Sequence, residues 1–126
     1  MTNVKAHILI VEDDPSVCRF ASETLKSFGY NVCNSANGKL ALEQIESNKN
    51  SFDLIVTDLI MPELNGKEFV SKVNKIFPNV KVIYVSGYTD NHIVHNGLLD
   101  EDVNFIHKPY SVTTLAAKVR EVLDND

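Results

Sequence analysis

The sequence predicts a doubly wound α/β fold, in which a five-stranded parallel sheet carries helices on both faces. Three observations predict it. Four short apolar runs rich in Ile and Val, and a fifth, weaker run, alternate with segments of helical spacing along the chain. Strands that alternate with helices pair in parallel through right-handed crossovers, and near-continuous apolar strands need helices on both faces. The length of 126 residues, 44% of them hydrophobic, indicates one globular domain, 1–126.

The five apolar runs place the strands. They cover residues 6–11, 30–33, 52–56, 80–85 and 103–106. Their shortness and their β-branched residues favour strands over helices. Asn31 interrupts the second run, and a half-polar strand belongs at the edge of a sheet. The expected strand order is therefore 2-1-3-4-5, the flavodoxin-like order.

A helix is expected after each strand. Apolar residues at helical spacing occur within 17–28, 41–45, 69–77, 89–99 and 115–123, and the pattern is vaguest at 89–99. Asp14 is a candidate N-cap before Pro15, because proline is tolerated in the first turn of a helix. Ser111 is the candidate cap of the last helix, and Gly29 stands where the first helix ends.

Charge and cysteine usage exclude several classes of function. The chain has 12 Lys+Arg against 17 Asp+Glu, a formal net charge of -5, without a basic cluster. We therefore expect no direct contact of this domain with nucleic acid or with an anionic membrane surface. No apolar run approaches the roughly 18 to 20 residues that a membrane span needs. Cys18 and Cys33 form no metal-ligand spacing, which indicates a reduced, cytoplasmic setting.

Polar side chains stand at the ends of four of the predicted strands. They are Glu12, Asp13 and Asp14 after strand one, Asp58 after strand three, Ser86 after strand four, and His107, Lys108 and Pro109 after strand five. In open α/β sheets, sites form beyond the carboxyl ends of the strands. Two carboxylates about 5 Å apart repel by roughly 3 kcal/mol at an effective dielectric near 20, so a cation is expected between them.

The ligand chemistry of these side chains favours Mg²⁺. Oxygen ligands without His or Cys select a hard ion, and a few carboxylates completed by water suit Mg²⁺ better than a Ca²⁺ cage. Lys108 could pair with Asp58 or with an added phosphoryl oxygen, and the Ser86 hydroxyl could donate to another. These groups suit phosphoryl transfer onto a carboxylate.

Four motifs at these strand ends resemble the receiver domains of bacterial two-component signalling, the response-regulator fold. They are I-L-I-V-E-D-D-P at 8–15, V-T-D-L-I-M-P-E-L-N-G at 56–66, V-S-G-Y at 85–88 and F-I-H-K-P-Y at 105–110. The resemblance covers essentially the whole chain. It implies that Asp58 is the phosphoacceptor and that Glu12, Asp13, Asp58 and the backbone carbonyl of Ile60 bind Mg²⁺. It also implies that Ser86 is the switch hydroxyl, Lys108 the phosphoryl-pairing lysine and Phe105 the switch aromatic. The Lys108–Pro109 peptide is expected to be cis.

Two departures and one finer likeness add expectations. Glu12 replaces the more frequent Asp of the acidic pair. Ile60 and Tyr88 stand where the family tunes dephosphorylation, and we hypothesise that these bulky residues obstruct the attacking water and lengthen the lifetime of the aspartyl phosphate. The segments V-S-G-Y-T-D-N-H-I-V-H-N-G-L-L-D and K-V-R-E-V-L-D are most similar to receivers attached to hybrid sensor histidine kinases.

The resemblance implies a signalling domain rather than an enzyme. A sensor histidine kinase or a histidine phosphotransfer domain would phosphorylate Asp58, and the domain would assist its own phosphorylation and dephosphorylation. Phosphorylation would change the surface of the fourth helix, fifth strand and fifth helix, through which a phosphorylation-dependent homodimer is a further expectation. Two alternatives stay open: a Mg-dependent phosphatase with an Asp nucleophile, which would need an acid where Ile60 stands, and an unphosphorylated receiver-like binding module.

Overall fold

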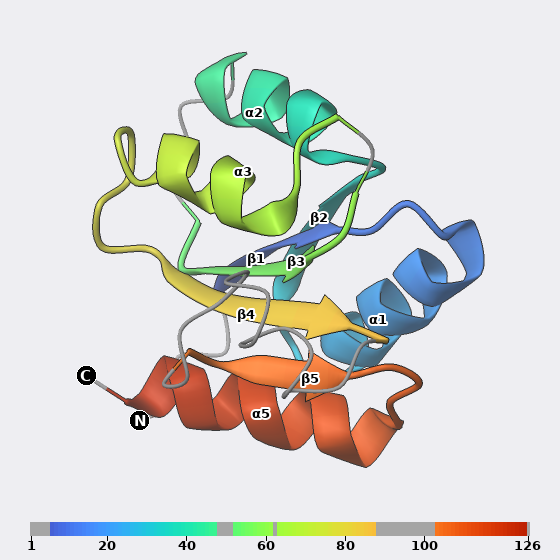
Figure 1. Cartoon of the computed structure of the whole chain (residues 1–126). Helices are drawn as coiled ribbons and strands as arrows, with labels where there is room; N and C mark the ends of the chain where they lie inside the picture. The colour runs from blue at the N-terminus through green and yellow to red at the C-terminus, as the bar shows by residue number, and fades with distance from the viewer. Residues whose placement is uncertain (1–5, 48–51, 62, 88–102, 126) are drawn as a thin grey trace.

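The computed structural model describes residues 6–47, 52–61, 63–87 and 103–125 and contains one five-stranded sheet (Figure 1). The strands are all parallel and lie in the order β2-β1-β3-β4-β5, so the predicted fold class and strand order are confirmed. The elements are β1 (His7–Val11), α1 (Pro15–Ser27), β2 (Asn31–Ser35), α2 (Gly38–Ser47), β3 (Leu54–Asp58), α3 (Gly66–Val73), β4 (Lys81–Ser86), β5 (Phe105–His107) and α5 (Val112–Asp124).

Strand boundaries differ from the prediction at both ends. Each strand begins one or two residues after the start of its apolar run, and all except β1 end one or two residues beyond it. The polar residues Asp58, Ser86 and His107 are therefore the last members of β3, β4 and β5. Asp58 pairs with Val85, and Ser86 pairs with His107. Strand pairing uses only backbone N–H and C=O groups, so a polar residue can be part of a strand. The apolar runs indicate only where side chains enter the core.

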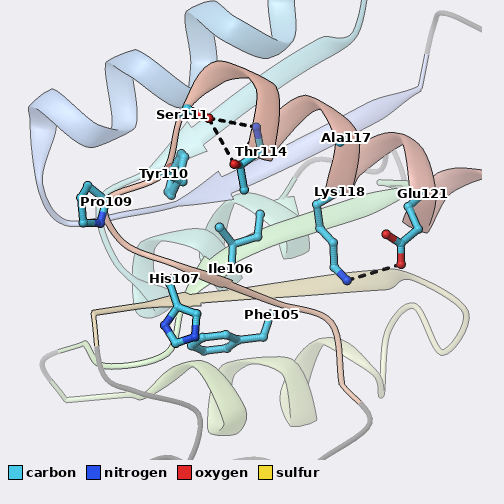
Figure 2. A pocket seen from close by; sticks show the side chains of 10 residues that line it. All are labelled: Phe105, Ile106, His107, Pro109, Tyr110, Ser111, Thr114, Ala117, Lys118 and Glu121. Carbon is cyan, nitrogen blue, oxygen red and sulfur yellow. Dashed lines mark hydrogen bonds and ion pairs between the residues drawn. The ribbon is translucent and has the colours of Figure 1, made fainter.

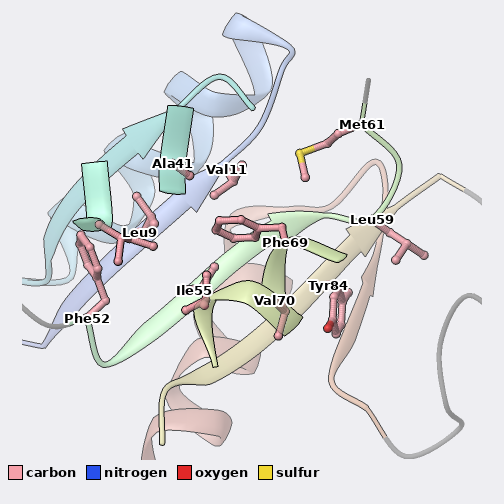
Figure 3. Packing of buried hydrophobic residues seen from close by; sticks show 12 residues of the cluster. Leu9, Val11, Ala41, Phe52, Ile55, Leu59, Met61, Phe69, Val70 and Tyr84 are labelled. Atoms are coloured by element: carbon pink, nitrogen blue, oxygen red, sulfur yellow. The ribbon is translucent and has the colours of Figure 1, made fainter. Parts of the chain in front are cut away.

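The sheet separates two apolar layers. Helices α2 and α3 cover one face, and α1 and α5 cover the other (Figure 1). Phe69 of α3 is fully buried among residues of the central strands, as Figure 3 shows. On the other face, Leu115 of α5 and Leu25 of α1 pack against β1, β3 and β4 residues such as Ile83. Strand β2 is only half buried, in agreement with its edge position.

The helix ends follow the predicted signals. The Asp14 carboxylate accepts hydrogen bonds from the backbone N–H groups of Ser16 and Val17 at the start of α1. Gly29 follows α1 with φ of 95°, a left-handed conformation that glycine adopts without steric cost. The Ser111 hydroxyl accepts the N–H of Thr114 at the start of α5. These predictions are confirmed, and the caps at Asp14 and Ser111 mark where the strand-to-helix loops end and the helices begin.

One predicted element lies outside the described residues. The expected helix at 89–99 falls within the undescribed segment 88–102, so the labels pass from α3 to α5. Within the described ranges, the longest helices have 13 residues, and none has the length and apolar character to cross a membrane.

Candidate functional site

The site lies at the carboxyl ends of the central strands. Glu12 follows β1 directly, and Asp58 is the last residue of β3, so the parallel pairing of these two strands brings the two side chains to one rim. Both residues are buried, with 5% and 4% of their surface exposed. Asp13 is exposed, and one carboxylate oxygen of each of the three residues lies within 4.8 Å of the others. The predicted convergence of the acidic side chains is therefore observed.

Lys108 contacts two of these carboxylates. Its Nζ lies 2.8 Å from Glu12 Oε1 and 2.8 Å from Asp58 Oδ1. The backbone N–H of Lys108 donates to the carbonyl of Ser86 at 2.9 Å, which fixes the start of the β5–α5 loop against β4. The sequence suggested a pair of Lys108 with Asp58; the second contact, with Glu12, was not predicted. A single ammonium thus contacts two buried carboxyl groups.

Burial and mutual repulsion perturb the titration of the site. Burial, followed by the neighbouring Glu12, raises the pKa of Asp58 to about 8, although Lys108 acts in the opposite direction. Burial alone would lower the pKa of Lys108, but its contacts with Asp58 and Glu12 outweigh burial and raise it. Asp58 is therefore a carboxylate whose charged form needs more positive charge than Lys108 provides.

The β3–α3 loop packs tightly against the end of β3. The N–H of Leu59 donates a hydrogen bond to Val85 O at 2.9 Å, and the N–H of Gly66 donates one to Leu59 O at 2.7 Å. A Cβ atom on Gly66 would collide with the carbonyl oxygen of Asp58 and lie 3.0 Å from Leu59 Cα. The Asn65 side chain and Glu68 form a capping box at the start of α3. Gly66 therefore lets α3 begin directly beside the phosphoacceptor candidate.

An apolar pocket borders the acidic rim. It has a volume of about 470 Å³ and lies between the first turns of α1 and the β5–α5 loop. The rings of Phe20 and Tyr110 both line it, with centroids 6.0 Å apart and an interplanar angle of 43°. Burial, followed by the charge of Glu12, raises the pKa of Tyr110 to about 12, so its hydroxyl stays neutral beside the acids. Lining residues are Ser16, Val17, Phe20, Lys108, Pro109 and Tyr110.

The remaining predicted site residues take different positions. Ser86 is buried at the end of β4, with 4% of its surface exposed. Ile60 is the second residue of the β3–α3 loop, and 44% of its surface is exposed. Phe105 is half buried at the start of β5 and packs against the α2–α3 side of the core. The Lys108–Pro109 peptide bond is cis. Tyr88 lies outside the described residues.

Sequence reasoning missed two contributors to the site. Strand order places Glu12 and Lys108 on one rim, but the reach of two long side chains does not follow from it. Gly66 is part of the motif at 56–66, but no role was predicted for it. The capping-box signature N-x-x-E at Asn65 and Glu68 nevertheless indicates that a helix starts there. A helix start so close to the end of β3 is the signal that could have identified Gly66.

Comparisons with known proteins agree with this geometry. The family model of the response regulator receiver domain matches residues 8–120. The chain is 36% identical over 119 residues to sensor kinase CckA from Brucella abortus (strain 2308), a match that covers 94% of this chain and 13% of the kinase. It is 28% identical over 116 residues to the response regulator receiver protein CpdR of the same organism, covering 92% of this chain and 95% of CpdR.

A solved structure gives the same result. The crystal structure of the receiver domain from the hybrid histidine kinase CckA matches with a TM-score of 0.79 and 32% identity, over 94% of this chain and 99% of that domain. The predicted likeness to receivers of hybrid kinases is thereby confirmed. With the family model matching most of its length and a relative above 30% identity, this chain belongs to the response regulator receiver domains of two-component signalling.

Proposed function

We propose that this receiver domain is a phosphoacceptor switch in which Asp58 takes a phosphoryl group from a phosphohistidine. The observation that carries the proposal is the position of Asp58 Oδ1, 2.8 Å from Lys108 Nζ, within a cluster of three carboxylates. The bond between the imidazole nitrogen and phosphorus breaks as a bond between an Asp58 oxygen and phosphorus forms. Lys108 then faces the new phosphoryl oxygens, where its charge counts most. Ser86 is the proposed switch hydroxyl.

A Mg²⁺ ion fits the donor set of the rim. Glu12, Asp13 and Asp58 present only hard carboxylate oxygens close together, and two of the three are buried beside a single ammonium. We assign these three residues, with the backbone carbonyl of Ile60, to hold the ion. When bound, the ion neutralises negative charge on the carboxylates and on the transferred phosphoryl group. Asp14 is excluded from the ligand set because its side chain caps α1.

The apolar pocket beside the rim offers a docking surface for a protein that donates the phosphoryl group. Phe20, with 38% of its surface exposed, and the neighbouring Tyr110 line this pocket together with Lys108, which contacts Asp58. A sensor histidine kinase or a histidine phosphotransfer domain would bind here and present its phosphohistidine to Asp58. We place this domain in the cytoplasm, where the phosphohistidine of such a donor would meet it.

Intact-mass measurement after incubation with acetyl phosphate and Mg²⁺ tests the proposal. We expect one added phosphoryl group on the parent and none on Asp58→Asn. Asp53→Asn is the matched control, because Asp53 is exposed just before the amino end of the same strand, where it accepts the backbone N–H of His7. It should gain the group like the parent. Chelation of Mg²⁺ should slow the gain strongly, and a parent that gains no mass would contradict the proposal.

Ile60 is proposed to lengthen the lifetime of the phosphorylated state. Its partly exposed side chain stands two residues after Asp58, where it can obstruct an attacking water. The same position would carry the general acid of a phosphatase that uses Asp58 as nucleophile, and an aliphatic side chain cannot donate a proton. Decay of phosphorylated protein should be faster in Ile60→Asn; equal or slower decay would contradict the role. Tyr88, the second tuning candidate, lies outside the described residues.

The outer face of β5 and α5 is the proposed output surface. It carries a pocket of about 610 Å³ between the strand and the helix (Figure 2). An ion pair of Lys118 and Glu121 at 3.4 Å borders it. We propose that phosphorylation changes this surface and that a homodimer forms through it; the fourth helix of the expected surface lies outside the described residues. Light scattering of the phosphorylated protein, with Asp58→Asn as control, should show the dimer; a monomer in both states would contradict it.

A further inference from the structure

The side chain of His107 lies directly against the Phe105 ring. The two rings have centroids 4.8 Å apart and an interplanar angle of 81°, an edge-to-face arrangement. Residues two apart in a strand share a face of the sheet, and Figure 2 shows both rings on the side of β5 away from α5. Ile106, between them, points the other way and is buried in the α1–α5 layer. The Phe105 ring therefore has a neighbour on its own strand.

His107 is also the cross-strand neighbour of Ser86. The register of β4 and β5 pairs Ser86 with His107 and Tyr84 with Phe105. Directly paired residues of neighbouring strands point to the same face. The backbone bond from Lys108 N to Ser86 O holds this end of the ladder in place. His107 is thus the residue paired with Ser86 across the ladder and the ring neighbour of Phe105 along its own strand.

We propose that His107 is a positioning residue that links Ser86 to the Phe105 ring. The inference rests on the proposed function, because Ser86 and Phe105 take their roles from it. The ladder fixes the backbone of β5, so a change at Ser86 reaches Phe105 through the side chains on this face. The His107 imidazole contacts the Phe105 ring and belongs to the residue paired with Ser86, and its edge-to-face contact favours the observed position of the Phe105 ring.

Exposure of His107 makes the proposal testable without unfolding the domain. His107 is exposed, whereas Phe105 is half buried and Ile106 is buried. Truncation of His107 to Ala therefore removes the ring contact and leaves the core layers intact. His107→Phe restores an aromatic ring at the same place and is the conservative variant. His7→Ala is the matched control, because His7 is an exposed histidine at the start of β1, at the opposite ends of the strands.

The first measurement uses the unphosphorylated protein with ¹³C-labelled phenylalanine rings. The Phe105 signals are assigned by their loss in Phe105→Leu. We expect His107→Ala to raise the population of other ring positions about 2- to 12-fold, the range that an edge-to-face contact corresponds to. His107→Phe should keep the parental signals, and so should His7→Ala. Phe105 signals in His107→Ala that match those in His7→Ala would overturn the proposal.

The second measurement tests the link to Ser86 by a double-mutant cycle. Ser86→Ala should displace the Phe105 signals in the parent, and the displacement should fall at least about twofold in the His107→Ala background. An equal displacement in both backgrounds, or none in the parent, would overturn the link. Neither measurement uses phosphorylation, so a failure of Asp58 to gain a phosphoryl group would refute the proposed function while these results still decide the role of His107.

Discussion

The β1–α1 loop and the β3–α3 loop both lead from an acidic strand end into a capped helix, but they are held by different means. The first is three residues long, and side chains bond to its backbone: Glu12 accepts the N–H of Asp14 at 3.0 Å, and Asp14 caps α1. In the second, backbone conformation matters more. Glu63 has φ of 69°, and Gly66 leaves no room for a Cβ atom.

This difference indicates which part of the rim tolerates change. A residue whose side chain bonds to the backbone can be replaced by another polar residue that forms the same bond. If the bond is lost, the free energy of unfolding falls by about as much as the loss of one helix cap. A close approach of two backbones has no such substitute, because a new atom must displace one of them. The residues after β3 should therefore be more sensitive to added volume, and the residues after β1 more sensitive to lost polarity.

The largest expected effect concerns Asp58 and pH. Its native pKa of about 8 exceeds the unfolded value, so between about pH 4 and pH 8 the folded state holds a proton that the unfolded state has lost. In metal-free buffer, the free energy of unfolding should fall as pH rises through this range, by up to about 1.4 kcal/mol per pH unit. Asp58→Asn should flatten this dependence and be more stable than the parent at pH 8.

Urea unfolding at several pH values, with a chelator present, measures this effect. Asp53→Asn is again the control, because Asp53 is an exposed carboxylate, and it should keep the parental slope. Excess Mg²⁺ should weaken the slope by favouring the charged carboxylates. A parent whose stability rises with pH between 4 and 8 would show that Asp58 is not the buried acid inferred from its surroundings.

A smaller loss is expected for Gly66→Ala. Alanine normally stabilises a helix relative to glycine by about 0.5–1 kcal/mol, but here its Cβ would collide with Asp58 O. We expect a net loss of about 1–3 kcal/mol. Gly87→Ala is the control, because a Cβ there meets no atom within 4 Å, and its effect should stay within about 0.5 kcal/mol. If the two variants are equally stable in urea, the β3–α3 loop is not sensitive to added volume at Gly66.

Asp14→Ala tests the side-chain bonds of the first loop. It removes the side-chain acceptor for the N–H groups of Ser16 and Val17 and should lower the free energy of unfolding by about 1 kcal/mol. Asp14→Ser, which restores a hydroxyl acceptor, should recover most of that loss. Thermal unfolding of the three proteins at one pH measures both changes. If the serine variant is no more stable than the alanine variant, capping is not what Asp14 contributes.

The smallest effect is a gain, expected for Glu63→Gly. Glycine removes the cost of a left-handed conformation at φ of 69° and adds entropy to the unfolded chain, so the net gain should be about 0.5 kcal/mol. Glu43→Gly, an exposed substitution within α2, should instead cost about 1 kcal/mol. Opposite signs for these two variants would confirm that conformation, not composition, sets the stability of the second loop.

Periodicity and strand order carried most of the prediction from sequence. Apolar runs and half-polar β2 were enough for the sheet order, and parallel pairing then brought Glu12, Asp13 and Asp58 together. Local signals predicted Asp14 and Ser111 as caps because capping is a contact within three residues. These features depend on short-range patterns or on topology, which a sequence expresses directly.

Details of contact were not predictable in the same way. The Lys108–Glu12 pair depends on the reach of two flexible side chains, and the close approach at Gly66 depends on the packing of α3 against β3. The alternation of a strand puts Phe105 and His107 on one face, but not the angle between their rings. Such features arise from three-dimensional packing, for which one sequence provides no periodic signal.

The two ion pairs of Lys108 have a mechanical consequence for the edge of the sheet. Strand β5 is three residues long and, within the described part of the chain, pairs only with β4. Lys108, directly after it, reaches past β4 to the ends of β1 and β3. The shortest strand is therefore attached to the centre of the sheet by charge rather than by a second ladder. A change of charge at Asp58 therefore acts on the anchorage of β5 directly, through Lys108.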